Sequence, residues 1–178
     1  TVYASLDGEK WHKVGREKAP AYEDNKVKEI VVTLDEYVKA RYIRFYITGT
    51  STWLFLDEIS VIADVEGSGT GFDFVNAVND AYKVHGAVAR PEGVKDIDYS
   101  LKKTLISSGA KYQTYSTVVE KFKDNGKMLT DGKVSGFFEG ETWVGFGAEK
   151  DSSVVIDLGR VVDDIACVEA SFYTNTAV

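Results

Sequence analysis

Residues 40–64, ARYIRFYITGTSTWLFLDEISVIAD, constrain the fold of this chain more than any other stretch. Apolar side chains alternate with polar or aromatic ones over residues 42–48, which is the two-residue period of a strand with one face on a core. Polar residues at 49–52 interrupt the pattern, and an apolar run resumes it over 54–63. The stretch therefore predicts two β-strands joined by a short loop.

Two adjacent carboxylates, Asp57 and Glu58, lie inside the second apolar run. Burying a carboxylate is costly unless a positive or hydrogen-bonding group meets it. Either one of the two side chains faces water, or both are buried against such a group. The alternation alone leaves both possibilities open.

Composition excludes several classes of partner. The chain has 178 residues, of which 44% are hydrophobic, so it is long enough for one well-cored domain. Its formal net charge of −7 argues against nucleic acid and against an anionic membrane surface. Since no apolar run approaches the ~20 residues of a membrane span, we expect no membrane insertion.

Catalytic and redox motifs are also missing from the sequence. The single cysteine, Cys167, excludes an internal disulfide, and His12 and His85 share no metal-ligand spacing. We find no phosphate-binding loop and no nucleophile elbow, so we expect no enzyme. The chain begins at Thr1 without an initiator Met, which suggests a piece of a longer protein.

Turn signals and changes in local composition divide the chain into three parts. Residues 1–64 are β-rich, and Asp7-Gly8 predicts a hairpin between strands at 2–5 and 11–14. Residues 65–106 form a linker that opens with VEGSGTG and contains a predicted helix at 74–85. Residues 107–178 are again β-rich. Further strands are predicted at 29–34, 110–115, 142–146, 153–158 and 164–172, with a turn at 35–39.

Three stretches together carry a resemblance to a known family. They are VYASLDGEKWHKV at 2–14, the two strands at 40–61, and LTDG at 129–132 followed by WVGF at 143–146 and SVVIDLGRVVDDIACVEASFY at 153–173. This set resembles the discoidin family, also called the coagulation factor V/VIII type C domain, which includes bacterial carbohydrate-binding modules of family 32. The resemblance implies an all-β jelly-roll β-sandwich.

The order of the stretches is inverted relative to the family, because its opening half lies here at the C-terminal end. We therefore expect a discoidin-like sandwich assembled from permuted halves, as from a tandem-repeat protein read out of register. The halves can close within one chain as a circular permutation, or between chains by domain swapping. The predicted shared core consists of Ile43, Phe45, Ile47, Ile59, Val61, Val154, Ile156, Leu158, Ile165 and Cys167.

The resemblance also implies a structural Ca²⁺ beside the DG turn. Carried over by position, it makes Asp131 and Glu58 the side-chain ligands. Oxygen ligands at a turn suit a hard cation, and the ion would offset the burial of Glu58. The loop after Asp131, KVSGFFEGET, differs from the family's usual pattern, and without an ion Asp131 is an ordinary turn residue. The carbonyl ligands implied are those of Met128, Lys133, Gly136 and Asp57.

For function, the resemblance implies sugar binding by loops at one end of the sandwich. The candidate aromatic platform is Phe137, Phe138, Tyr115 and Trp53, although Trp53 also suits a core position. We therefore expect a non-catalytic glycan-binding module of an extracellular or cell-surface bacterial protein. The alternative is a structural or adhesive repeat that binds a protein partner or spaces other domains.

Overall fold

A computed structural model describes residues 1–19, 27–48, 53–64, 104–135, 142–147 and 151–175. The predicted helix at 74–85 lies outside these residues. Most of the described chain is β-strand, with two single-turn 3₁₀ helices, so the predicted all-β class is confirmed. The elements are β1 (Val2–Ser5), β2 (His12–Gly15), β3 (Lys28–Thr48), β4 (Trp53–Ala63), β5 (Thr104–Leu105), β6 (Lys111–Thr114), η1 (Glu120–Phe122), η2 (Met128–Thr130), β7 (Val144–Phe146) and β8 (Asp151–Asn175).

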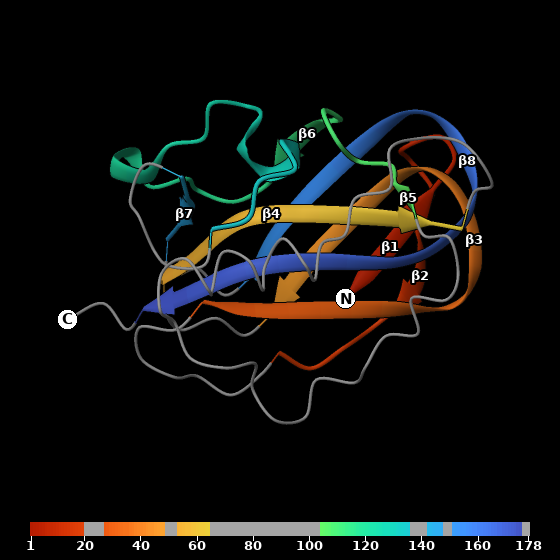
Figure 1. Cartoon of the computed structure of the whole chain (residues 1–178), viewed down its shortest axis with the longest axis horizontal. Coiled ribbons are helices and arrows are strands. Elements are labelled where there is room, and N and C mark those ends of the chain that lie inside the picture. Colours follow the sequence, from red (N-terminus) through yellow and green to blue (C-terminus); the bar gives the residue numbers. More distant parts are fainter. Residues whose placement is uncertain (20–26, 49–52, 65–103, 136–141, 148–150, 176–178) are drawn as a thin grey trace.

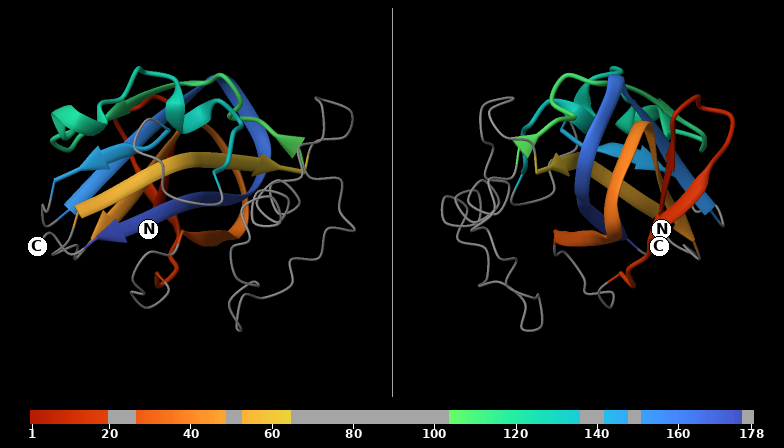
Figure 2. Two further views of the ribbon diagram at one scale, coloured as in Figure 1. Left: turned by 60° about the vertical axis from the view of Figure 1, so that its left-hand side comes forward. Right: turned by 90° about the vertical axis from the view of Figure 1, so that its right-hand side faces the viewer.

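The strands form one antiparallel sheet that bends into two layers (Figures 1 and 2). The strand order is β2-β1-β3-β8-β4-β5, with β6 added to β8 and β7 to β4. Both β3 and β8 run through the two layers. Layer A contains β2, β1, residues 42–48 of β3, residues 151–157 of β8, and β6. Layer B contains residues 28–33 of β3, residues 165–175 of β8, β4, β5 and β7.

The bend between the layers differs from the sequence expectation. Residues 35–39, predicted as a turn, stay within the continuous strand β3, and the strands predicted at 153–158 and 164–172 are two parts of β8. The pairing of β3 with β8 is irregular here, and Gly159 and Asp164 adopt positive φ angles of 75° and 59°. The pairing of β3 with β8 continues on both sides of residues 35–39. This polar stretch is therefore a bend in two paired strands and not a turn that ends a strand.

The predicted hairpin between β1 and β2 is confirmed, with a loop longer than two residues. The Ser5 hydroxyl accepts a hydrogen bond from the Gly8 N–H at 2.9 Å, and Gly8 has a φ of +81°, which glycine adopts without strain. The indole Nε1–H of Trp11 donates to the Gly8 carbonyl at 3.0 Å. The loop therefore fixes the orientation of the Trp11 ring.

Both parts of the chain contribute to one main core. Ile47 and Leu158 are partly buried against it, while Cys167 lies in a separate small cluster with Ile62 and Leu105. Successive residues of a strand point to opposite faces of the sheet. In this part of β8 Val168 and Ala170 face the main core, so Cys167 points to the other face. The prediction of a shared core is confirmed, while a permutation relative to the family stays a prediction. The predicted residues inside the main core are Ile43, Phe45, Ile59, Val61, Val154, Ile156 and Ile165.

Residues 104–135 and 142–146 border the edges of both layers (Figure 1). The short strand β5, at the end of the predicted linker, pairs with Ile62 and Ala63 of β4. Leu129 of η2 is fully buried in the main core. This anchor holds the turn that follows η2 next to β4, where the candidate site lies.

Candidate functional site

A β-bulge places the two carboxylates of β4. Leu56 pairs with Phe172 and Glu58 with Ser171, so Asp57 is an extra residue in the ladder. A bulge breaks the strict alternation and re-aims a side chain. Both carboxylates are buried, with Asp57 3% and Glu58 0% exposed, so neither faces water.

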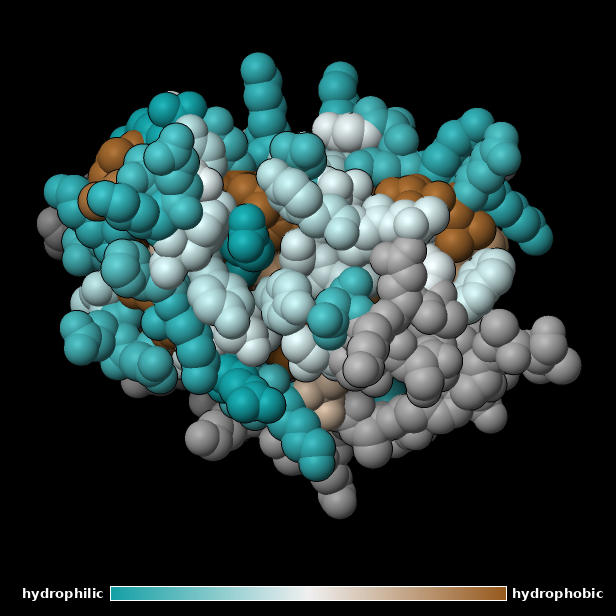
Figure 3. Space-filling view, turned by 180° about the vertical axis from the view of Figure 1, so that it is seen from behind, coloured by the Kyte–Doolittle hydropathy of each residue, from teal (hydrophilic) through white to brown (hydrophobic). Residues whose placement is uncertain are grey.

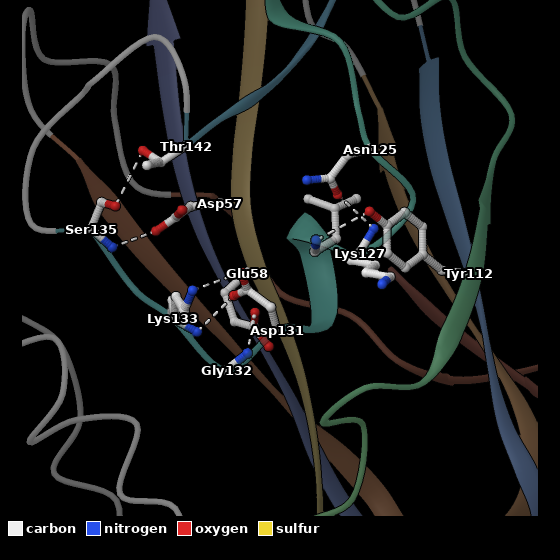
Figure 4. Close-up of polar contacts among 11 residues, drawn as sticks. Asp57, Glu58, Tyr112, Asn125, Lys127, Asp131, Gly132, Lys133, Ser135 and Thr142 are labelled. Atoms are coloured by element: carbon white, nitrogen blue, oxygen red, sulfur yellow. Dashed lines mark hydrogen bonds and ion pairs between the residues drawn. The ribbon is translucent and has the colours of Figure 1, made fainter.

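Main-chain donors of the turn after η2 meet these carboxylates (Figure 4). Glu58 Oε2 accepts a hydrogen bond from the Gly132 N–H at 3.1 Å, and Asp57 Oδ2 accepts one from the Ser135 N–H. Asp131 Oδ1 accepts from the Lys133 N–H at 2.9 Å, which stabilises the turn. Glu58 Oε1 is buried and has no hydrogen-bond partner among the described residues. The second oxygen of Glu58 is therefore available to a further group.

Burial dominates the electrostatics of this pair. Desolvation raises the pKa of Glu58 to about 9, and the charges of Asp131 and Asp57 act in the same direction. Desolvation also raises the pKa of Asp57 to about 7, against the lowering effect of the Ser135 hydrogen bond. Without a cation, Glu58 is thus protonated at neutral pH. A bound cation would favour the ionised form instead.

The described donors fit an oxygen-coordinated cation in part. The structure brings Asp57, Glu58 and the turn at Asp131 together, with Met128 at the start of η2 and Lys133 just after the turn. Among the described residues, no group of three or more His, Cys, Asp or Glu side chains is arranged to hold a metal ion. A cation here would therefore depend largely on main-chain carbonyls, and Gly136, one of the predicted carbonyl donors, lies outside the described residues.

The predicted aromatic platform is described only at Tyr115 and Trp53, since Phe137 and Phe138 lie outside the described residues. Trp53 is partly buried and packs against the cluster of Val27, Phe55, Trp143 and Tyr173 at the start of β4. Tyr115, next to β6 in layer A, is 56% exposed. Of these two described rings, Tyr115 is accessible and Trp53 has a packing role.

The sequence interpretation missed a second polar and aromatic feature, on the outer face of layer A. The Arg44 guanidinium carbon lies 4.3 Å from the centroid of the Trp11 ring and 5.7 Å from that of Tyr115. Beside them, the rings of Tyr3 and Tyr46 meet edge to face at 6.2 Å. The alternation of residues 42–48 placed Arg44 and Tyr46 on one face. It could not show that the hairpin loop places Trp11 over the same face.

Comparison with known proteins agrees with the N-terminal part of this architecture. No curated protein and no solved structure matches the chain significantly. In the part of the chain that the structure describes, no helix is long and apolar enough to cross a membrane. The matched region of the one family model runs from β1 into β4, and it ends just after the bulge at Asp57 and Glu58. Residues 1–59 match the F5/8 type C domain, the discoidin family, which confirms the resemblance seen in the sequence.

Proposed function

We propose that this chain is a non-catalytic carbohydrate-binding module of an extracellular multidomain or tandem-repeat protein. The observation that carries the proposal is the match of residues 1–59 to the F5/8 type C domain. Domains of this type are generally non-catalytic binding modules, typically extracellular or surface-associated. The exposed ring of Tyr115 supports a glycan ligand, because amphipathic aromatic side chains offer both an apolar face and a polar tip.

A glycan array followed by calorimetric titration tests this function. We expect binding of at least one galactose-type or cell-wall sugar, and we expect Tyr115→Ala to weaken it about tenfold through loss of a stacking surface. Tyr37→Ala is the matched control, because Tyr37 is 55% exposed but lies at the bend. A folded protein that binds no glycan at millimolar concentration would favour the alternative, a structural or adhesive repeat with a protein partner.

We further propose that the bulge and the turn hold a structural Ca²⁺. Asp131 and Glu58 would supply side-chain oxygens, and Met128, Lys133, Gly136 and Asp57 would supply carbonyl oxygens. The unpartnered Oε1 of Glu58 supports the proposal, because a buried polar atom without a partner is costly and a hard cation would satisfy the ionised carboxylate. The ion would order the turn and carry out no chemistry.

Thermal melting with chelator and with added Ca²⁺ tests the metal proposal. A ligand that binds only the folded state raises stability by about 2.7 kcal/mol at a hundredfold excess over its Kd. We expect Glu58→Gln to abolish the difference between the two conditions, and Glu120→Gln, a change at an exposed residue of η1, to preserve it. Identical melting of the unmodified protein in both conditions would leave Asp131 and Glu58 with local structural roles only.

A further inference from the structure

The outer face of layer A gathers several cations in an acidic chain, and its carboxylates include Asp151, against the Tyr46 hydroxyl, and Asp157, paired with Arg41. Tyr3 of β1 lies between Lys13 of β2 and Arg44 of β3, which pair with it from the two neighbouring strands. Further along the sheet, Lys111 of β6 pairs with Asp157 of β8. The chain as a whole carries a formal charge of −7. Cations on one sheet face of such a chain create a local potential that favours an anionic ligand.

Arg44 differs from the other arginine near this face. Arg41 donates to both carboxylate oxygens of Asp157, at 2.8 and 2.9 Å, so its charge is paired. Within the described part of the chain the side chain of Arg44 makes no ion pair and no hydrogen bond, and its Nε is buried without a partner. An arginine whose donors remain unused on a protein surface is suited to a ligand that brings its own acceptors.

Aromatic contacts hold this unused guanidinium in place. The guanidinium carbon of Arg44 lies over the Trp11 ring, 4.3 Å from its centroid. The hydrogen bond from Trp11 Nε1 to the Gly8 carbonyl fixes the orientation of the indole. The centroid of the Tyr115 ring lies 5.7 Å from the same guanidinium carbon, and the Tyr115 hydroxyl donates to Gln113 Oε1 at 3.1 Å. Pre-positioned groups bind with a smaller entropic cost than mobile ones. Figure 3 looks onto this face, where residues of intermediate hydropathy form a pale band across the middle.

The ligand class follows from these groups. A planar guanidinium pairs best with a carboxylate, which it can bind through two parallel hydrogen bonds. The exposed ring of Tyr115 beside it offers an apolar surface for a sugar ring. We propose that the outer face of layer A binds a uronic-acid unit of an acidic glycan, with the carboxylate on Arg44 and the sugar ring against Tyr115. The inference rests on the proposed glycan-binding function and places this ligand on a sheet face rather than at the end loops.

Two-dimensional ¹H–¹⁵N NMR titration with trigalacturonate, and with its methyl ester as the uncharged match, tests the proposal. We expect the acid to shift the resonances of Arg44, Gln113 and Tyr115, and the ester to bind about tenfold more weakly, since it lacks the charge-assisted hydrogen bonds. Binding should also weaken in high salt.

Variants separate a binding role from a structural one. Arg44→Gln and Tyr115→Ala should each weaken trigalacturonate binding about tenfold. Arg160→Gln, at an exposed residue of the bend, should leave it unchanged. Since Arg44 contacts Trp11, Arg44→Gln could unfold the protein, whereas Tyr115→Ala removes a ring that is 56% exposed and keeps the test valid.

Three other outcomes of these titrations would overturn the proposed uronic-acid site, and they can be told apart. Shifts confined to the loops with neutral sugars would leave the glycan-binding function intact and remove the sheet-face site. Absence of binding by every glycan would overturn both. Equal binding of a short polyglutamate peptide at Arg44 would show a general carboxylate site rather than a glycan site.

Discussion

Glu58 is a fully buried acid whose two oxygens have different surroundings. Oε2 accepts the Gly132 N–H, while Oε1 has no partner among the described residues. Burial disfavours the ionised form of this group in the metal-free protein more than its hydrogen bonds favour it, which raises its pKa to about 9. The protonated form is therefore the stable one in the folded protein without a cation.

This raised pKa predicts a pH-dependent stability. The folded state binds a proton that the unfolded state has lost, so the free energy of unfolding should fall as the pH rises from 4.5, the ordinary value, to about 9. The slope from one such group is at most about 1.4 kcal/mol per pH unit. We expect Glu58→Gln to remove most of this slope in urea denaturation with chelator present.

Two comparisons keep this pH prediction specific. Asp57 contributes a similar slope, but only between 3.8 and about 7, so the range from pH 7 to 9 reports mainly on Glu58. Glu120→Gln should retain the slope of the unmodified protein. A slope of equal size in Glu58→Gln would show that other groups dominate.

At the scale of single residues, the sequence predicted which residues of the candidate site lie together. It did not predict the backbone geometry that brings them together. The resemblance placed Glu58 beside the Asp131-Gly132 turn, and the hydrogen bond from Gly132 to Glu58 joins these segments. The bulge at Asp57 could not be predicted, because the apolar run around it continues without a break. The contact of Trp11 with Arg44 likewise depends on the conformation of the hairpin loop.

At the scale of elements, strands were easier to predict than their boundaries. The polar residues Asp35, Glu36 and Tyr37 read as a turn, and the glycine and acidic residues near Gly159 and Asp163 read as a gap. In the structure these residues belong to β3 and β8, whose pairing continues on both sides of the bend, and Lys39 and Asp163 form an exposed ion pair across it at 2.9 Å. Local composition marks where a strand bends, and only the pairing partner shows that it continues.

Packing of β7 against η1 predicts a sharp difference between two nearby glycines. A Cβ on Gly145 would lie 2.8 Å from Phe122 Cβ and 2.9 Å from Phe55 Cε1, whereas a Cβ on Gly147 meets nothing within 4 Å. We expect Gly145→Ala to lower the free energy of unfolding by about 1–3 kcal/mol, because overpacking forces neighbours to move. Gly147→Ala should stay within about 0.5 kcal/mol of the unmodified protein. Urea denaturation measures both, and equal effects would contradict the packing.

At the scale of the whole molecule, the sheet joins the two β-rich parts of the chain. The first part supplies β1 to β4 and the second supplies β8, which pairs with both β3 and β4. The sequence allowed this prediction because neither part has enough apolar faces to fill two layers. It could not decide between closure within a chain and exchange between chains, because the same strand pairs form in both.

This topology predicts that a cut between the two parts will not separate them. A protease site introduced between residues 80 and 90 should yield two fragments that co-elute in size-exclusion chromatography and separate only in denaturant. Each purified fragment alone should lack a cooperative unfolding transition, because the main core contains residues of both. The uncut protein with the same site is the control.

The outcome that contradicts this topology is separation of the fragments under native conditions. Light scattering of the intact chain over a dilution series provides an independent check. A monomer at all concentrations supports closure within one chain, whereas a dimer that persists on dilution supports exchange of parts between chains.

The position of β8 has a consequence for biosynthesis. Strands β3 and β4 follow one another along the chain, yet β8 lies between them in the sheet. On the ribosome, β3 and β4 therefore emerge long before the strand that must insert between them. Their apolar faces and unpaired edges stay exposed in the nascent chain during this interval. We expect the emerging N-terminal part to be a chaperone substrate until β8 leaves the exit tunnel.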